Sequence, residues 1–178
     1  MDLVGALRGV LGRNVVGGVC GGRPAAVLVP LVVLGGVVHV VLVKRSSGLR
    51  FHGGEYGFPG GVVEEGEGFV EAALREAEEE VGVGRGLVEV LGFLPVVRTL
   101  TGFVVVPVVG LLSLPEGFSF RVNPAEVEEV FVPPLEGLFR GRCVDAFGVC
   151  YVYDGRRVWG ATARVLSRLF ESLGWVRD

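Results

Sequence analysis

One segment constrains the fold of this chain more than any other: residues 24–43 carry no formal charge, and twenty such residues are enough for a helix to span a bilayer. Two features argue against a spanning helix. Pro30 lies inside the segment, and Gly35-Gly36 divides it into two runs dominated by β-branched valine. Apolar runs joined by a two-residue glycine turn are typical of a β-hairpin. We therefore expect buried strands at Ala26–Leu34 and Val37–Val43, and no membrane partner.

The composition indicates a folded enzyme or binding module. The chain has 178 residues, 50% of them hydrophobic and 21% charged, which is enough apolar material for one core and excludes the disordered class. The net charge of -3 excludes the broad basic surface with which many proteins bind nucleic acid. We expect a single domain over 1–178, no nucleic-acid partner and a cytoplasmic location, since Asp2 stands where a signal peptide would be basic.

The cysteine pattern does not suggest a metal site. Cys20, Cys143 and Cys150 form no CxxC motif and have no histidine at ligand spacing, so a zinc site is disfavoured. Cys143 and Cys150 flank a predicted hairpin turn at 145–148, where a disulfide is one interpretation. Two buried thiols in a reducing cytosol are the interpretation that we favour.

The remaining pattern predicts a mixed α/β domain around one core. Helical spacing of Leu3, Leu7, Val10 and Leu11 predicts a short helix that ends near Gly12. A glycine-rich stretch at 17–22 then leads into the hairpin. Further helices are expected at 67–81 and 161–173, the second with Val165, Leu166, Leu169, Phe170 and Leu173 inward. Strands or strand pairs are expected at 87–97, 103–112, 127–132, 141–144 and 149–152.

The central helix, Glu67–Val81, carries an acidic cluster. At about 100° per residue, its buried stripe consists of Val70, Ala73, Leu74, Ala77 and Val81. Glu76, Glu79 and Glu80 lie together beside that stripe, whereas Glu78 points to the other side. Each like-charged pair at this spacing costs about 0.2 to 0.5 kcal/mol, and carboxylate oxygens suit Mg²⁺ or Mn²⁺. On the cluster alone, a solvated acidic face is the better interpretation.

A long motif surrounds the cluster. The fixed positions of GX5EX7REUXEEXGU, with U aliphatic, are occupied by Gly61, Glu67, Arg75, Glu76, Ala77, Glu79, Glu80, Gly82 and Val83. The chain therefore resembles the Nudix hydrolases, which cleave a nucleoside diphosphate linked to another moiety. The resemblance implies a mixed sheet sandwiched between helices, with the motif as a loop, helix, loop unit. It also implies that Glu76, Glu79 and Glu80 hold a divalent metal, and that Glu67 and Arg75 support that site.

A second motif lies directly before the first. Residues 42–61 read LVKRSSGLRFHGGEYGFPGG and are similar to the signature of coenzyme A pyrophosphatases, LLTXR(S/A)X3RX3GX3FPGG. The matched positions are Arg45, Ser46, Arg50, Gly54, Phe58, Pro59, Gly60 and Gly61. Val43 stands at the threonine position, which puts one polar contact with the substrate in doubt. The resemblance covers most of the chain and leaves only residues 1–23 outside it.

This second resemblance implies a small-molecule substrate, coenzyme A or a derivative, hydrolysed to 3',5'-ADP and 4'-phosphopantetheine or its acyl form. Arg45 and Arg50 suit bidentate contacts with phosphate, and an ion pair with Glu55 is the other interpretation. Another nucleoside diphosphate derivative, such as ADP-ribose or NADH, stays an alternative substrate. A non-catalytic nucleotide-binding module is the alternative from another class, and a homodimer stays open as the assembly.

The group that removes a proton from the attacking water is also open. The candidates are Glu79, Glu80, Glu126 and Glu129. Arg98 is a third candidate phosphate ligand. We expect His39 to lie in the core, assign no role to His52, and expect Tyr56 and Phe58 to pack the loop that carries the second motif.

Overall fold

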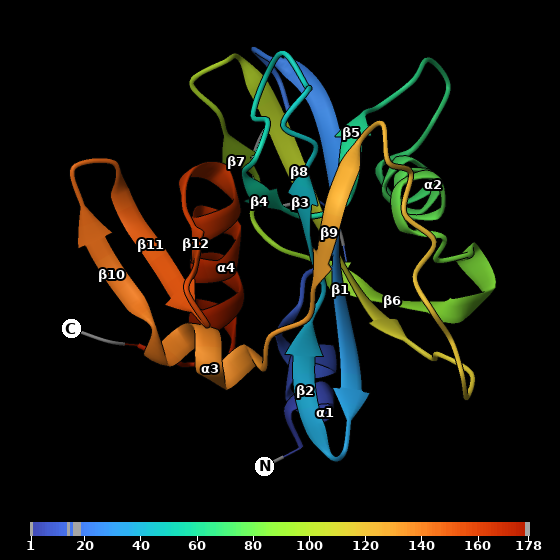
Figure 1. The fold of residues 1–178 in the computed structure, drawn as a ribbon, viewed down its shortest axis with the longest axis vertical. Coiled ribbons are helices and arrows are strands. Elements are labelled where there is room, and N and C mark those ends of the chain that lie inside the picture. Colours follow the sequence, from blue (N-terminus) through green and yellow to red (C-terminus); the bar gives the residue numbers. More distant parts are fainter. Residues whose placement is uncertain (1, 14, 16–18, 177–178) are drawn as a thin grey trace.

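The computed structural model describes residues 2–13, 15 and 19–176. Its helices are α1 (Leu3–Val10), α2 (Phe69–Val81), α3 (Leu135–Arg140) and α4 (Gly160–Ser172), with a 3-10 turn η1 (Arg85–Leu87). Its strands are β1 (Arg23–Leu34), β2 (Val37–Val40), β3 (Leu42–Arg45), β4 (Tyr56–Gly57), β5 (Gly60–Val62), β6 (Val88–Phe93), β7 (Val97–Arg98), β8 (Phe103–Leu112), β9 (Val127–Phe131), β10 (Arg142–Asp145), β11 (Gly148–Tyr153) and β12 (Arg156–Val158). Figure 1 shows α2 and α4 on opposite sides of the strands in the centre.

The central sheet has six strands in a mixed arrangement. Its main order is β2-β1-β8-β6, with β5 added beside β1 and β7 beside β8. Strands β1 and β8 run parallel, and the other neighbours are antiparallel. Two smaller sheets, β4-β3-β9 and β10-β11-β12, complete the fold. The mixed sheet between helices confirms the architecture expected from the sequence.

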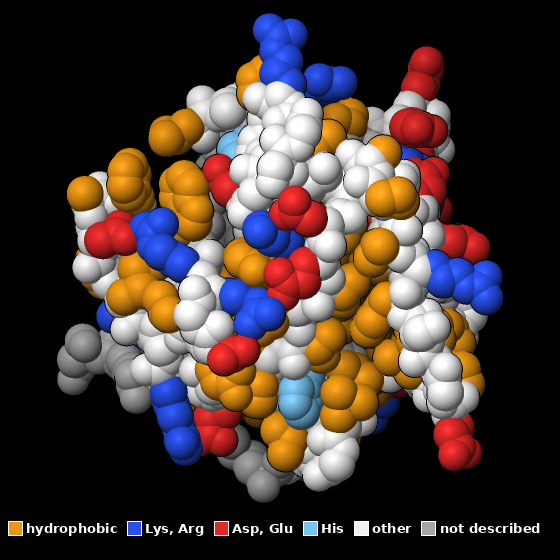
Figure 2. Space-filling model, viewed as in Figure 1, with side chains coloured by type: hydrophobic (Ala, Val, Ile, Leu, Met, Phe, Trp, Pro, Cys, Tyr) orange, Lys and Arg blue, Asp and Glu red, His pale blue; other side chains and the backbone are white. Residues whose placement is uncertain are grey.

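The predicted hairpin is present. Leu34 pairs with Val37 across the turn, and Gly35 and Gly36 have φ angles of 57° and 80°, which glycine adopts without strain in this type of turn. Figure 2 shows hydrophobic side chains around this hairpin, at the lower end of that face. No helix among the described residues is long and apolar enough to cross a membrane.

The second strand of the hairpin differs from the prediction. The expected strand 37–43 is interrupted at Val41, whose N–H bonds to the Pro30 carbonyl at 2.9 Å. Beyond that point the chain leaves β1, and β3 pairs with β4 and β9 instead. This change of sheet carries Arg45 and the loop after it away from the central sheet and toward β9.

Alternation along β1 divides the core into layers, because successive side chains of a strand face opposite sides of the sheet. Ala26 and Leu28 pack with α2, whereas Val29 and Leu31 pack in the cluster that contains the buried side chains of α4. That cluster includes Val165, Leu166, Leu169 and Phe170, as the helical spacing predicted, while Leu173 is only partly buried. Apolar packing on both faces of β1 thus fixes the position of α2 against the central sheet.

Several elements depart from the sequence prediction. The strand expected at 87–97 divides into the end of η1, β6 and β7. Both β6 and β7 pair with β8, and the gap between them contains Pro95, which has no N–H to donate to the sheet. Helix α1 buries Leu7 as expected, but Val10 is 54% exposed and lies on the solvent side. The sequence analysis missed α3 and β12, which are six and three residues long. Gly17 and Gly18 of the expected lead-in lie outside the described residues.

The cysteines correct another expectation. Cys143 and Cys150 are directly opposed across β10 and β11 and form a disulfide, with their Cα atoms 4.9 Å apart. The interpretation as two buried thiols is therefore wrong, because the antiparallel register brings the two side chains within bonding distance. Cys20 is a free, exposed thiol.

Candidate active site

Helix α2 presents the acidic residues of the first motif. It ends at Gly82, whose φ of 72° forms a left-handed cap with hydrogen bonds to the Ala77 and Glu78 carbonyls. Ala72, Ala73 and Ala77 form the buried side of the helix next to the glutamates and pack against the central sheet, and these small side chains let the helix approach the strands closely. Figure 2 shows acidic side chains over α2 and the loop before it, at the upper right of that face.

The three glutamates of the cluster differ in exposure. Glu80 is only 4% exposed, the Glu76 side chain is 15% exposed, and the Glu79 side chain is 54% exposed. The structure therefore brings them together as the sequence predicted, but arranges them from the protein interior out to solvent. The interpretation as a solvated acidic face therefore holds for Glu79 but not for the buried Glu80.

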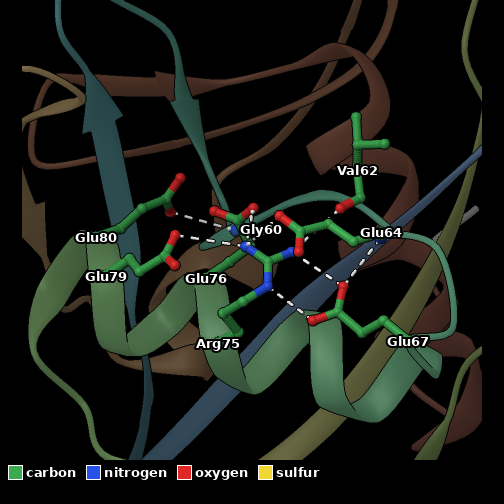
Figure 3. Close-up of polar contacts among 8 residues, drawn as sticks. All are labelled: Gly60, Val62, Glu64, Glu67, Arg75, Glu76, Glu79 and Glu80. Atoms are coloured by element: carbon green, nitrogen blue, oxygen red, sulfur yellow. Dashed lines mark hydrogen bonds and ion pairs between the residues drawn. The ribbon is translucent and has the colours of Figure 1, made fainter.

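Arg75 connects the acidic residues of the motif (Figure 3). Its Nε and Nη2 donate to the two carboxylate oxygens of Glu67 at 2.7 and 3.1 Å, and Nη2 also donates to the Val62 carbonyl. Its Nη1 donates to Glu76 at 3.0 Å and to Glu79 at 3.4 Å. The hydrogen bonds from Arg75 lower the pKa of Glu67 and keep its carboxylate charged. Glu67 thus fixes the arginine that aligns Glu76 and Glu79.

Glu80 lies in a different environment. Its Oε2 accepts a hydrogen bond from the Gly60 N–H at 3.3 Å, and it forms no ion pair with any residue that the structure describes. Burial raises the pKa of Glu80 to about 8, and the charge of Glu76 acts in the same direction. Burial also raises the pKa of Glu76. Both carboxyl groups would release their protons more readily beside an added cation.

Gly60 and Gly61 lie in close contact with β1 and α2. A Cβ atom on Gly61 would lie 2.3 Å from Oε1 of Glu76, and one on Gly60 would lie 2.4 Å from the Ala26 carbonyl oxygen. Both distances are below any normal contact, and the second involves backbone of β1. Position 60 therefore requires glycine, whereas Gly61 leaves room for the Glu76 carboxylate in its present position.

The loop of the second motif, residues 46–55, connects β3 to β4. Its ends are tied together because the Arg45 N–H bonds to the Glu55 carbonyl at 2.9 Å and the Gly54 N–H bonds to the Arg45 carbonyl at 2.8 Å. Arg45 is partly buried, and its Nε is buried without a hydrogen-bond partner. Its charge acts to lower the pKa of Glu80, so this guanidinium lies on the carboxylate side of the loop.

Arg50 lies elsewhere, at the exposed end of the loop. Its guanidinium is 5.4 Å from the centre of the Phe51 ring. Glu55, the expected alternative partner of both arginines, lies 3.1 Å from His52 Nδ1. The two arginines of the signature therefore occupy different parts of the loop.

The aromatic residues of the motif pack as expected. Phe58 is 6% exposed and belongs to the main core cluster, and the Tyr56 ring lies 5.6 Å from Phe131 in an edge-to-face contact. The Ser46 N–H bonds to the Glu126 carbonyl at 2.9 Å. These contacts join the loop to the segment that precedes β9.

That segment also joins the end of α2. The Asn123 N–H bonds to the Glu80 carbonyl at 3.0 Å, which places Glu126 beside the acidic face. Oε2 of Glu126 is buried without a hydrogen-bond partner, and the charge of Glu126 raises the pKa of both Glu76 and Glu80. Of the open candidates outside the helix, Glu126 is thus the one that the fold brings to the cluster.

Glu129 is engaged elsewhere. It accepts hydrogen bonds from Arg156 Nε at 2.7 Å and from the Tyr56 hydroxyl at 3.0 Å. The sequence analysis missed Arg156, because no local pattern connects residues that are 27 positions apart. Arg98 donates to the Cys20 carbonyl. His39 is half-buried, with Nδ1 2.9 Å from the Val37 carbonyl oxygen, so the expected core histidine is wrong.

The donor atoms fit a divalent cation. Carboxylate oxygens are the ligands that Mg²⁺ and Mn²⁺ prefer. Glu80 and the unpartnered oxygen of Glu126 are both buried, and neither residue forms an ion pair with another described residue. Within the described part of the chain, no three acidic, histidine or cysteine side chains yet converge as ready metal ligands. Arg75 and the Gly60 amide hold the carboxylates in their present positions.

Comparison with known proteins agrees with this geometry. The NUDIX domain model matches residues 22–143. The uncharacterized Nudix hydrolase NudL of Escherichia coli O1:K1 is 40% identical over 163 residues, which cover 85% of this chain and 83% of that protein. The uncharacterized NudL of Photorhabdus laumondii is 36% identical over 162 residues, 85% of each chain.

Solved structures share the fold at lower identity. The Nudix hydrolase RenU of M. smegmatis superposes with a TM-score of 0.63 at 20% identity, over 89% of each chain. The NUDIX domain of Shewanella oneidensis NrtR, solved with ADP ribose, superposes with a TM-score of 0.58 at 20% identity, over 85% of this chain and 88% of that one. With the motif, the fold and these relatives in agreement, the chain belongs to the Nudix hydrolase family.

Proposed function

We propose that this Nudix hydrolase cleaves the diphosphate of coenzyme A or its derivatives, giving 3',5'-ADP and 4'-phosphopantetheine or its acyl form. The observation that carries the proposal is the position of the second motif. The motif ends at Gly60 and Gly61, which lie against the acidic face of α2, and its loop follows the partly buried Arg45. A diphosphate between Arg45 and α2 would meet guanidinium on one side and the carboxylates on the other.

Glu76, Glu79 and Glu80 would hold the divalent cation, Mg²⁺ or Mn²⁺. Such a cation would stabilise negative charge on the phosphoryl oxygens and would lower the pKa of water, so that water loses a proton more readily and becomes the stronger nucleophile. Arg75 keeps Glu76 and Glu79 turned to one side of α2, and Glu67 keeps Arg75 in place. These two residues therefore position the ligands before substrate arrives.

Glu126 is the proton acceptor that we favour. Its Oε2 is buried and has no hydrogen-bond partner, so it can take a proton from water without first losing another contact. Glu129 is already bound to Arg156 and Tyr56. Glu79 and Glu80 are better used as cation ligands, because each lies on the face that Arg75 and Gly60 organise.

The two loop arginines have separate roles in this proposal. Arg45, whose Nε is buried and unpartnered, contacts the diphosphate that is cleaved. Arg50, exposed at the far end of the loop, contacts the peripheral 3'-phosphate of coenzyme A. Ser46, Gly54 and Phe58 shape the loop between them through backbone hydrogen bonds and core packing.

The valine at the threonine position of the signature does not weigh against coenzyme A. Val43 is 1% exposed and packs with Val32, Val81 and Val127. A threonine at position 43 would also face the core, so its hydroxyl would not reach a substrate. This removes the sequence feature that had favoured ADP-ribose or NADH as the substrate.

A substrate panel tests the proposal. Purified protein is incubated with coenzyme A, acetyl coenzyme A, dephospho-coenzyme A, ADP-ribose and NADH, with Mg²⁺, with Mn²⁺ or with EDTA, and the products are resolved by mass. We expect 3',5'-ADP from coenzyme A or its acyl form as the fastest reaction, and no reaction in EDTA. Faster cleavage of ADP-ribose or NADH would reject the substrate and leave the family assignment intact.

A further inference from the structure

The loop 46–55 exposes an aromatic ring that the proposed chemistry does not use. Tyr56 and Phe58 pack inside the protein, whereas the Phe51 ring is 65% exposed. Figure 1 shows the loop as the cyan segment that stands above β3 and β4, at the same end of the molecule as the loop before α2. The ring belongs to the loop that begins at Arg45, and its exposure shows that packing in the core is not its role.

The loop holds the ring in a defined place. Besides the two hydrogen bonds that tie its ends, the Leu49 N–H bonds to the Ser46 carbonyl at 3.1 Å and the Glu55 N–H bonds to the His52 carbonyl at 3.2 Å. A Cβ on Gly53 would lie 3.0 Å from three carbonyl oxygens of the loop. The loop is thus closely wound around Gly53, and six residues of chain keep Phe51 within about 20 Å of Arg45.

Arg50 prepares the ring for a second planar group. Its guanidinium lies 5.4 Å from the ring centre, in the range of a cation–π contact. This contact restrains the orientation of an exposed side chain. It also places a positive charge beside the ring, where an anionic, aromatic ligand would find both a stacking surface and a counter-charge.

We propose that Phe51 is a substrate-binding residue that stacks against the nucleobase through the face of the ring that Arg50 leaves open. This inference rests on the proposed function, because the diphosphate held at Arg45 and α2 sets where the nucleoside begins. The ligand class that it requires is a purine nucleoside with a 5'-phosphate. Position 51 is a variable position of the signature, so the residue there would tune affinity for the base and leave the bond-breaking step unchanged.

Two ligands that differ only in the base test the proposal in EDTA, where no turnover occurs. Binding of AMP and of ribose 5-phosphate is measured by calorimetry or NMR titration for wild type, Phe51→Ala and Phe51→Trp. Stacking on one aromatic ring changes affinity roughly 5- to 100-fold. We expect Phe51→Ala to weaken AMP by that factor and to leave ribose 5-phosphate unchanged. Phe51→Trp should retain AMP binding and add tryptophan quenching beyond that of wild type.

Phe147→Ala is the matched control, since Phe147 is 74% exposed on the turn between β10 and β11. It should bind both ligands as wild type does. Equal AMP affinity in wild type and Phe51→Ala would overturn the inference, and so would no preference of wild type for AMP over ribose 5-phosphate. A parallel assay with coenzyme A should show a raised KM and an unchanged kcat for Phe51→Ala. If wild type fails to cleave coenzyme A while AMP binding still depends on Phe51, the proposed substrate fails and the stacking role stands.

Discussion

The acidic face of α2 and the arginine loop 46–55 are built in opposite ways. On α2, side chains hold one another: Arg75 contacts Glu67, Glu76 and Glu79, and Glu80 is buried against Gly60. In the loop, the backbone is tied by hydrogen bonds, and Arg50 extends from it into solvent. A rigid set of carboxylates suits chemistry that needs fixed distances. A tied loop that presents one partly buried and one exposed arginine suits recognition of phosphates at two different positions of a substrate.

The largest expected effect is loss of a charge from the rigid side. Glu80→Gln or Glu79→Gln keeps the volume of the side chain but removes a charge from the proposed cation site. We expect kcat to fall by roughly a hundredfold or more, with circular dichroism and thermal unfolding showing an intact fold. Glu78→Gln is the control, because Glu78 is exposed on the other side of the helix, and it should retain wild-type kcat. Normal turnover in the Glu79 or Glu80 variant would show that α2 does not hold the cation.

The next effect separates the two arginines. Arg45→Ala should lower kcat/KM for coenzyme A and dephospho-coenzyme A equally, because both contain the diphosphate. Arg50→Ala should lower kcat/KM for coenzyme A more than for dephospho-coenzyme A, because dephospho-coenzyme A lacks the 3'-phosphate. A charge-assisted contact corresponds to about 1.5 to 3 kcal/mol, or about tenfold to a hundredfold in kcat/KM. If the two variants lost the same proportion of kcat/KM on each substrate, Arg45 and Arg50 would not have separate roles.

The last prediction concerns stability, and it follows from the buried charge. The pKa of Glu80 rises from 4.5 in an exposed glutamate to about 8 in the folded protein, so between these pH values the folded state binds more protons than the unfolded state. Glu80 therefore lowers the free energy of unfolding as pH rises through this window, by at most about 1.4 kcal/mol per pH unit. The effect should level off above pH 8.

Chemical denaturation in EDTA from pH 5 to 9 measures this effect. Glu80→Gln should be more stable than wild type at pH 8 and should show a shallower pH dependence. Wild type should recover stability on addition of Mg²⁺, and the variant should recover little. An identical pH dependence in the two proteins would mean that the carboxyl of Glu80 is not buried in solution as described.

Sequence alone predicts the parts of the fold that follow local rules. The hairpin at Gly35-Gly36 and helix α2, capped by Gly82, depend on turn geometry and apolar spacing within a short stretch. The break at Val41 does not, because it depends on β3 pairing with β9, which is some 85 residues away in sequence. The disulfide likewise depends on the register of β10 and β11.

The site divides in the same way. Helical geometry placed Glu76, Glu79 and Glu80 on one side of α2, but only packing shows that Glu80 is buried while Glu79 is exposed. The signature treats Arg45 and Arg50 alike, whereas the closure of the loop turns one toward the carboxylates and the other to solvent. Burial and orientation are set by distant segments, such as the turn at Asn123 that docks on the end of α2.

Direct measurement of cation binding tests the central claim, that the graded carboxylate face of α2 holds the metal. Free Mn²⁺ is followed by electron paramagnetic resonance during titration of wild type, Glu78→Gln, Glu79→Gln and Glu80→Gln without substrate. We predict that wild type and Glu78→Gln bind Mn²⁺ with the same affinity, and that Glu79→Gln and Glu80→Gln bind it at least about tenfold more weakly. Wild-type Mn²⁺ affinity in both the Glu79 and the Glu80 variant would contradict the account.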